Sequence, residues 1–314
     1  MRVVSAAEID RVLDFPGLIV AIREAFRGNI VAPARHHHAI PRVDAAGATL
    51  LLMPAWQSGN GGFIGVKIVS VFPDNATRTK PSVMGIYLLI AGDSGEPLAT
   101  LDGVALTLWR TAATSALVSD ALARPNSSRM TMIGAGALAP KLIAAHASVR
   151  SIAHVTIWNR SRDKAEQLAA SLNRPGLKVT ASNDREAAIR EADIVSVATL
   201  TKEPLVQGAW LKPGAHVDLV GGYTPTMREA DDDAIRRTTV YVDTRAGMKE
   251  SGDIAQPLTS GALKEADIAG DLFDIARGTA PGRRSSDEIT LFKSVGNAIE
   301  DLAAAVEVWK LLTT

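Results

Sequence analysis

The chain has 314 residues, of which 46% are hydrophobic and 22% charged, and its 34 basic and 34 acidic side chains give a formal net charge of zero. These values are typical of a folded globular protein large enough for two domains, and they exclude extensive disorder. Balanced charge argues against a nucleic-acid-binding surface, which needs clustered positive charge. Cysteine is absent, which excludes disulfides, thiolate nucleophiles and thiolate metal sites.

The sequence carries no signal for a membrane. No apolar run approaches the roughly 18 residues that are needed to cross a bilayer. The first residues lead directly into a polar, helix-like pattern and lack the apolar stretch of a signal peptide. We therefore expect a cytoplasmic protein that binds neither membranes nor nucleic acids.

The first third of the chain predicts two helices followed by an antiparallel sheet. Ser5 and Glu8 resemble a capping box that opens a helix ending near Leu13, and Pro16 suits the first turn of a second helix through Phe26. Five strand-like runs follow, and the short Gly/Asn/Asp links between them are typical of hairpins. These runs are His38–Val43, Thr49–Met53, Gly65–Phe72, Val83–Ile90 and Pro97–Leu101.

The pattern changes after a long helix that is expected at residues 103–123. From Arg129 onward strand-like and helix-like runs alternate, which indicates a doubly wound parallel sheet. The segment 289–311 reads as one long terminal helix that packs on the first domain. The expected strands are Met130–Ile133, Val155–Trp158, Lys178–Ala181, Ile194–Ala198, His216–Val220 and Thr239–Val242, and the expected helices include Ala137–Val149 and Ser161–Leu172.

These elements predict an α/β protein with two domains. A doubly wound parallel sheet would occupy residues 125–288. An α+β domain with an antiparallel sheet would contain residues 1–124 plus 289–314.

A glycine-rich turn follows the first of the alternating strands. Residues 134–139 read Gly-Ala-Gly-Ala-Leu-Ala, a G-x-G-x-x-A turn that opens a helix. Gly134 permits the tight turn, Gly136 lets the backbone approach a pyrophosphate, and Ala139 keeps the helix close to the strand. The positive end of the helix dipole then meets the phosphate charge. The strand–turn–helix context favours a dinucleotide site over a purely structural turn.

The residues after the next strand bear on the choice of cofactor. Asn159 lies 25 residues after Gly134, where an NAD site usually places an acid for the ribose 2′-hydroxyl. Asn159 has no charge, whereas Arg160, Arg162 and Lys164 could pair with a 2′-phosphate, to which a guanidinium donates two parallel hydrogen bonds. We expect NADP(H), with NAD(H) as the alternative cofactor. The competing interpretation is a solvated, basic helix start.

Three further segments, together with the glycine-rich turn, carry a family resemblance. They are Gly65–Ser70 (GVKIVS), Leu106–Ala113 (LTLWRTAA) and Ile289–Gly296 (ITLFKSVG). In this order, over nearly the whole chain, they resemble the ornithine cyclodeaminase/μ-crystallin family. The resemblance implies a Rossmann domain and a dimerisation domain with an antiparallel sheet completed by the terminal helix, and hence a homodimer.

The resemblance also implies roles for single residues. Arg35, Lys67 and Arg110 match positions that hold the substrate carboxylate and the reacting centre, and Val295 lies near the substrate. The residues that it places at the cofactor are Ser82, Arg110, Ala137, Leu138, Asn159 and Ser294. Cations are the natural partners of a carboxylate. Neighbouring cations and an apolar site lower the pKa of a lysine, so that it can act as an acid or a base near neutral pH. Taken alone, each of these charges is more often a surface residue.

Two acids that cyclodeaminases of this family carry are missing here. Tyr223 replaces an Asp, and a phenol with a pKa of about 10 cannot act as a base near neutrality. Leu51 replaces a Glu that would bind the distal amine of ornithine. We therefore expect a clamp of cations with no acid nearby to drive the hydrolytic loss of ammonia, and no cyclodeamination of ornithine.

With cyclodeamination set aside, the resemblance implies that NAD(P)H reduces a cyclic imino acid. Hydride would be delivered to C2 to give L-proline or L-pipecolate. The segment 218–231 resembles the Δ1-pyrroline-2-carboxylate reductase branch of the family. The alternatives are an ornithine cyclodeaminase, an alanine dehydrogenase, or a non-enzymatic binder of small ligands. The run His36-His37-His38 predicts no metal site, because consecutive strand residues point to opposite faces.

Overall fold

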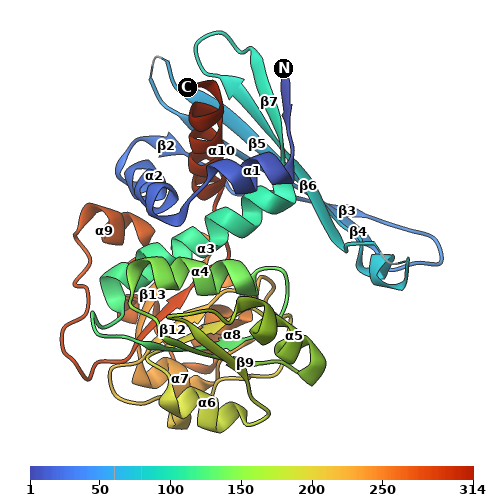
Figure 1. Cartoon of the computed structure of the whole chain (residues 1–314). Helices are drawn as coiled ribbons and strands as arrows, with labels where there is room; N and C mark the ends of the chain where they lie inside the picture. The colour runs from blue at the N-terminus through green and yellow to red at the C-terminus, as the bar shows by residue number, and fades with distance from the viewer. Residues whose placement is uncertain (60, 79) are drawn as a thin grey trace. The chain divides into compact units, whose positions relative to one another are not determined.

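The computed structural model describes residues 1–59, 61–78 and 80–314, and the chain packs as two compact units (Figure 1). Unit 1 contains Met1–Arg110 and Asn297–Thr314, and unit 2 contains Thr111–Gly296. Unit 2 is therefore inserted into the chain of unit 1. These boundaries differ from the 124/125 and 288/289 boundaries expected from the sequence. None of the helices in the described ranges is long and apolar enough to span a bilayer.

Unit 1 is built on a sheet in the order β1-β7-β6-β5-β4-β2, with β3 paired to β4 beside β2. Neighbouring strands in this sheet are antiparallel, except that β1 runs parallel to β7. Its elements are β1 (Arg2–Val4), α1 (Ala6–Val12), α2 (Phe15–Arg27), β2 (Ile30–Val31), β3 (His36–Ile40), β4 (Ala48–Gln57), β5 (Phe63–Val71), the 3-10 helix η1 (Pro73–Arg78), β6 (Val83–Ala91), β7 (Pro97–Asp102), the first residues of α3 (Gly103–Leu122) and α10 (Ala298–Thr313).

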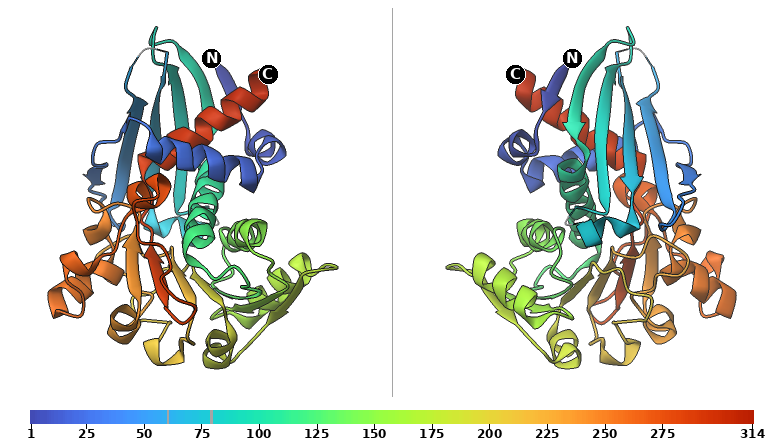
Figure 2. Two further views of the ribbon diagram at one scale, coloured as in Figure 1. Left: turned by 90° about the vertical axis from the view of Figure 1, so that its left-hand side faces the viewer. Right: turned by 90° about the vertical axis from the view of Figure 1, so that its right-hand side faces the viewer.

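The two faces of this sheet differ. Helices α2 and α10 lie on one face, as the two views of Figure 2 show, and side chains on that face are buried, among them Met53, Lys67, Tyr87 and Leu89. Side chains alternate between faces along a strand, and paired residues share a face. The opposite face, which we call the open face, consists of the half-buried or exposed residues Leu52, Pro54, Ile64, Val66, Ile68, Ile86, Leu88 and Ile90.

The structure confirms most of the expected elements of unit 1. The Ser5–Glu8 capping box is present at the start of α1, and Pro16 lies in the first turn of α2. The strand expected at 38–43 begins two residues earlier, at His36, and ends at Ile40. The parallel edge strand Arg2–Val4 was not expected, since three residues carry too little periodicity to predict a strand.

Unit 2 is a doubly wound parallel sheet in the order β10-β9-β8-β11-β12-β14-β13. The order reverses between β8 and β11, which is the point where such sheets bind ligands at the carboxyl ends of their strands. The elements of unit 2 after α3 are β8 (Arg129–Ile133), α4 (Ala139–Val149), β9 (His154–Trp158), α5 (Arg162–Leu172), β10 (Lys178–Ala181), α6 (Arg185–Glu191), β11 (Ile194–Val197), η2 (Gly208–Trp210), β12 (His216–Leu219), α7 (Asp232–Arg237), β13 (Thr239–Val242), η3 (Met248–Glu250), α8 (Gly252–Ser260), η4 (Glu265–Asp267), α9 (Leu272–Arg277) and β14 (Thr290–Lys293).

The expected terminal helix at 289–311 is wrong in its first part. Residues Thr290–Lys293 form β14, which lies between β12 and β13, and all four of these residues are buried. A strand covered on both faces reads as a continuous apolar run, which periodicity cannot distinguish from a buried helix. Gly296 has a φ of 83° and separates the strand from α10, whose N-cap is Asn297.

Candidate active site

A cluster of buried charges lies in unit 1, where β5 faces the first turn of α10. Lys67 comes from β5 and is only 3% exposed, and Asp301 comes from α10 and is fully buried. The ammonium nitrogen Nζ of Lys67 lies 2.9 Å from Oδ1 and 2.7 Å from Oδ2 of Asp301. Lys67 is held at this place because its strand neighbours Met53 and Tyr87 point to the same buried face.

Arg110 joins the same cluster from α3. Its Nη1 donates to Oε2 of Glu300 over 2.6 Å, and its Nε lies 3.0 Å from Oδ1 of Asp301. Glu300 is fixed in turn, because its other oxygen accepts the backbone N–H of Asn297 in a capping box. Arg35 is close enough for its charge to act on both Lys67 and Asp301. Three of the side chains predicted for the substrate site are thus brought together.

These contacts set the proton affinities of the cluster. Burial lowers the pKa of Lys67 to about 8, the carboxylate of Asp301 opposes this lowering, and the charges of Arg110 and Arg35 add to it. Burial disfavours the ionised form of Asp301, but the neighbouring cations outweigh it and hold the pKa of its carboxyl below the ordinary value. Lys67 is therefore a cation at neutral pH that can release a proton in the physiological range.

Two acids that the sequence analysis did not anticipate lie beside the cations. Glu300 and Asp301 contact Arg110 and Lys67 directly, as charges removed from water must be paired. Both carboxylates serve as ion-pair partners of the cations. Leu51, where cyclodeaminases of this family carry an acid, lies on the same sheet face as Lys67, two residues from its neighbour Met53.

Unit 2 carries the glycine-rich turn at residues 134–139, for which the sequence predicts phosphate binding. Gly134 has a φ of 111°, which favours glycine, and open space lies where a Cβ of Gly136 would be. Helix α4 begins at Ala139, and within the described residues no side chain caps its first turn. Uncapped backbone N–H groups at a helix N-terminus bind anions. The residues present therefore fit the pyrophosphate of a dinucleotide.

The residues that follow β9 comprise Asn159, which forms two hydrogen bonds to the backbone, and a basic segment at the start of α5. The Asn159 side chain accepts from the backbone N–H of Ala135 over 3.3 Å and donates to the carbonyl of Ser161 over 2.9 Å. Asn159 thus ties the end of β9 to the phosphate-binding turn. Arg160 is exposed beside it, whereas Arg162 is paired with Glu166 at 2.5 Å.

The remaining predicted residues lie in two places. Ser294 and Val295 follow β14 in unit 2, where Asp243 accepts the backbone N–H of Val295 and that of Gly296, each over 2.7 Å. Ser82 belongs to unit 1, just before β6, and its carbonyl accepts the N–H of Phe72 over 2.8 Å.

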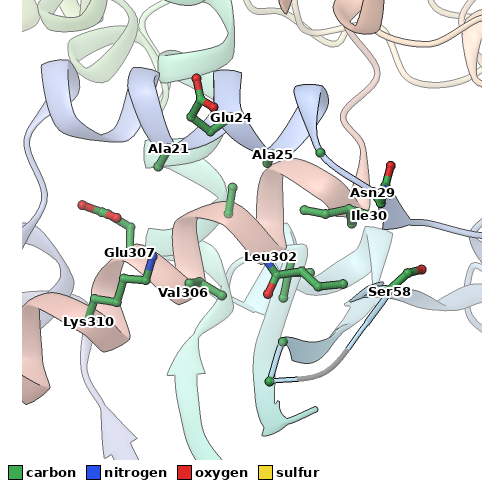
Figure 3. A pocket seen from close by; sticks show the side chains of 15 residues that line it. Ala21, Glu24, Ala25, Asn29, Ile30, Ser58, Leu302, Val306, Glu307 and Lys310 are labelled. Carbon is green, nitrogen blue, oxygen red and sulfur yellow. The ribbon is translucent and has the colours of Figure 1, made fainter. Parts of the chain in front are cut away.

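A separate cavity in unit 1 has a volume of about 590 Å³. Figure 3 shows that Glu24 and Ala25 of α2 line it together with Leu302 and Val306 of α10. The cation cluster contributes none of the described lining residues, so this cavity is distinct from the cluster. No group of three or more His, Asp or Glu that could hold a metal ion occurs in the part of the chain that the structure describes.

Sequence reasoning missed the acidic half of the cluster. Asn297 and Glu300 form a capping box, and this local role explains Glu300 fully at the level of the sequence. The capping box therefore gives no indication of the contact between Glu300 and Arg110. A signal was present, however, because Glu300 and Asp301 are adjacent acids in a helix that is otherwise largely apolar. Tyr87, whose buried hydroxyl has no hydrogen-bond partner in the described structure, was also missed.

The chain is similar to known proteins over nearly its whole length. Residues 1–313 match the ornithine cyclodeaminase/mu-crystallin family. A Δ1-pyrroline-2-carboxylate reductase of Colwellia psychrerythraea is 37% identical over 313 residues, which cover 98% of each chain. The structure of Thermococcus litoralis Δ1-pyrroline-2-carboxylate reductase in complex with NADH and L-proline superposes with a TM-score of 0.93 at 31% identity, covering 100% of this chain and 98% of that one. The structure of an archaeal alanine dehydrogenase dimer with bound NAD superposes with a TM-score of 0.91 at 26% identity, covering 100% of this chain and 96% of that one. The chain belongs to the ornithine cyclodeaminase/mu-crystallin family.

Proposed function

We propose that this protein is an NAD(P)H-dependent oxidoreductase that reduces cyclic imino acids, converting Δ1-pyrroline-2-carboxylate to L-proline and Δ1-piperideine-2-carboxylate to L-pipecolate. The relatives named as Δ1-pyrroline-2-carboxylate reductases support this reaction class. A solved relative holds NADH and L-proline, which are a nicotinamide cofactor and the expected product.

The gathering of cations in unit 1 is the observation that carries the proposal. Lys67 and Arg110 lie together there with their ion-pair partners Asp301 and Glu300, and the charge of Arg35 acts on Lys67 and Asp301. Cations are the natural partners of a substrate carboxylate. A substrate with a second ammonium group, such as ornithine, finds no additional acid in this cluster.

The residues then act as follows. Arg35 and Arg110 bind the substrate carboxylate, and Val295 lies near the substrate. The cofactor, when bound, supplies a hydride to C2 of the C=N bond. The ring nitrogen gains an electron pair in this step and takes up one proton, which the Lys67 ammonium donates and later recovers from solvent. The burial of Lys67, Arg110 and their two acidic partners strengthens these interactions by excluding water.

The turn at 134–139 supports the cofactor part of the proposal. Gly134, Gly136, Ala137, Leu138 and Ala139 would hold the pyrophosphate through the backbone and the dipole of α4. The residues assigned to the rest of the cofactor are Ser82, Arg110, Asn159, Arg160 and Ser294. We favour NADP(H) over NAD(H), because the exposed guanidinium of Arg160 suits a 2′-phosphate and no acid follows β9 at Asn159.

The open face of the unit 1 sheet supports a homodimer. Its side chains are apolar and none is fully buried, and Ile86 is 47% exposed. Contiguous exposed apolar patches of this kind mark protein interfaces. The related archaeal alanine dehydrogenase was solved as a dimer. A second copy of this chain is therefore the partner that we assign to the open face.

A single panel of assays tests the function. Oxidation of NADPH and NADH is followed with five- and six-membered cyclic imino acids and with pyruvate plus ammonia, and ammonia release is followed with ornithine and NAD⁺. We expect rapid turnover with the cyclic imino acids alone. Ammonia release from ornithine without imine reduction would show a cyclodeaminase instead, and turnover of pyruvate plus ammonia would show an alanine dehydrogenase. Ligand binding without turnover of any substrate would show a non-enzymatic binder.

A further inference from the structure

A second buried group of charges lies in unit 2, at the carboxyl ends of three adjacent strands. Oε1 of Glu229 accepts both the backbone N–H and the hydroxyl of Thr199, each over 2.8 Å. Its Oε2 accepts the backbone N–H of Gly221 over 2.8 Å and that of Gly222 over 3.3 Å. One fully buried carboxylate thus joins the loop after β11 to the loop after β12.

Glu229 is itself held by two charged side chains. Oδ1 of Asp253 accepts the backbone N–H of Glu229 over 2.7 Å and that of Ala230 over 3.1 Å. The Nζ of Lys293, the last residue of β14, lies 3.2 Å from Asp253 and 3.9 Å from Glu229. All three side chains are almost completely buried, so the arrangement is fixed by its own contacts rather than by solvent.

The loop that Glu229 fixes after β11 forms one wall of the phosphate-binding turn. A Cβ on Gly134 would lie 2.5 Å from the carbonyl oxygen of Ala198 and 3.4 Å from the side chain of Thr199. In a doubly wound sheet the adenosine half of a dinucleotide extends toward the second strand, here β9. The other half of the cofactor then extends toward β11 and β12, and the loops that Glu229 joins border it.

We propose that Glu229 is a positioning residue that fixes the two loops bordering the nicotinamide half of the cofactor site. This inference rests on the proposed use of a nicotinamide cofactor, and it is independent of which substrate is reduced. Glu229 acts through the backbone of Thr199, Gly221 and Gly222. Gly221 approaches the carboxylate closely, since a Cβ on Gly221 would lie 2.6 Å from its Oε1.

The ionised carboxylate is the form that fits this place. Four donors surround its two oxygens, so a proton on Oε2 would face two N–H groups and find no acceptor. Burial nevertheless raises the pKa of Glu229 to about 7; Lys293 opposes this rise, and Asp253 adds to it. Among the described residues, Lys293 of β14 and Asp253 of α8 are the charged groups that act most strongly on Glu229. Lowering the pH through about 7 therefore protonates Glu229 and releases one of the loops.

The test compares a whole cofactor with its adenosine half. The dissociation constants of NADH and of AMP are measured by calorimetry for the wild type and for Glu229→Gln. An amide has one acceptor oxygen and loses the contacts of the other, so we expect about tenfold weaker NADH binding. AMP binding should stay within about twofold. Asp193→Asn is the matched control, because Asp193 also accepts two backbone N–H groups but lies at the opposite end of β11. This control should leave both constants unchanged.

A milder variant covers the case in which Glu229→Gln does not fold. Thr199→Val keeps the branched side chain and removes one hydrogen bond to Glu229. It should weaken NADH binding about threefold at neutral pH, and it should add nothing when combined with Glu229→Gln.

The pH dependence separates positioning from a general structural role. The dissociation constant of NADH for the wild type should rise below about pH 7, and Glu229→Gln should abolish this rise. NADH alone is used for the pH series, because the phosphate monoesters of AMP and NADPH would themselves titrate near about pH 6. Equal losses of NADH and AMP binding, or unchanged NADH binding in Glu229→Gln, would overturn the inference. A wild type that binds no nicotinamide cofactor would overturn the proposed function and this inference together.

Discussion

Lys67 and Asp301 are 234 residues apart in the chain, and their ammonium and carboxylate groups lie 2.7–2.9 Å apart in the interior of unit 1. The pair gives Lys67 a permanent counterion, so that it stays protonated at neutral pH despite its burial. Removing a buried charge from its partner is costly, which couples the proton affinity of Lys67 to the state of Asp301. Several properties of the enzyme depend on this pair.

The first prediction concerns pH. Burial lowers the pKa of Lys67 to about 8, and the reduction needs the protonated form. The kcat/KM for imine reduction should therefore be constant between about pH 6 and 7 and fall tenfold per unit well above about pH 8. The reverse oxidation of L-proline needs the neutral amine, so its rate should rise over the same range. Initial rates in both directions measure this, and a reduction rate that does not fall up to about pH 9.5 would exclude Lys67 as the proton donor.

The second prediction concerns Asp301→Asn. The negative charge of Asp301 raises the pKa of Lys67, so its removal should lower that pKa further and move the fall in kcat/KM to lower pH by at least about one unit. Glu300→Gln is the control, because Glu300 pairs with Arg110, whereas Asp301 pairs with Lys67. It should weaken substrate binding and leave the position of the fall nearly unchanged. Equal shifts in the two variants would contradict the pairing.

The third prediction concerns Lys67→Ala. Loss of the proton donor should reduce kcat by about 100-fold or more. Cofactor affinity, measured by the fluorescence of bound NADPH, should be unchanged, because Lys67 lies outside the nucleotide-binding fold and is not among the residues assigned to the cofactor. Lys310→Ala, a change at an exposed lysine of α10, should leave both quantities as in the wild type. A parallel loss of NADPH affinity would mean that Lys67 serves the cofactor instead.

The fourth prediction concerns cofactor choice. Arg160→Asp places a carboxylate where a ribose 2′-hydroxyl is usually bound, so the ratio of kcat/KM for NADPH to that for NADH should fall by about 100-fold. Arg162→Asp makes the same charge change in the same segment, but Arg162 is already paired with Glu166. Its effect should be several times smaller. An unchanged ratio in Arg160→Asp would show that Arg160 does not reach the 2′-phosphate.

The fifth prediction concerns assembly. Ile86→Lys places a charge in the middle of the open face, and burying an unpaired charge in an interface is strongly unfavourable. Sedimentation velocity should show a dimer for the wild type and a monomer for this variant at micromolar concentration. Val20→Lys changes a residue of α2 that is 55% exposed and should leave the dimer intact. If both variants are monomers, or if both are dimers, the open face is not the dimer interface.

Much of the fold could be predicted from the sequence, because the strands and helices of unit 2 alternate with clear boundaries. The limits of β10 (Lys178–Ala181) and β13 (Thr239–Val242) were predicted to the residue. β14 was missed because it is covered on both faces and leaves no period-two pattern. The pairing of β1 with β7 was missed because it joins segments almost a hundred residues apart, which no local pattern records.

Part of the candidate site could likewise be predicted from the sequence, and part of it could not. The turn at Gly134 could be predicted because its residues are consecutive and each glycine has a local conformational reason. The ion pairs of Lys67 and Arg110 could not, because their partners come from the far end of the chain and Glu300 already has a complete local explanation as a capping residue. Burial of charge is a property of packing, so the two carboxylates could be recognised as partners only once α10 was placed on the sheet.

The insertion of unit 2 into unit 1 has a consequence for biosynthesis. Every residue of unit 2 leaves the ribosome before Asn297, where the last segment of unit 1 begins. The nucleotide-binding half can therefore fold during translation, whereas the sheet of unit 1 waits for α10 to cover it. Until then Lys67 and Arg110 have no counterions from Glu300 and Asp301, so this group of buried charges is completed last, and a premature stop codon before Asn297 would leave its cations without these two partners.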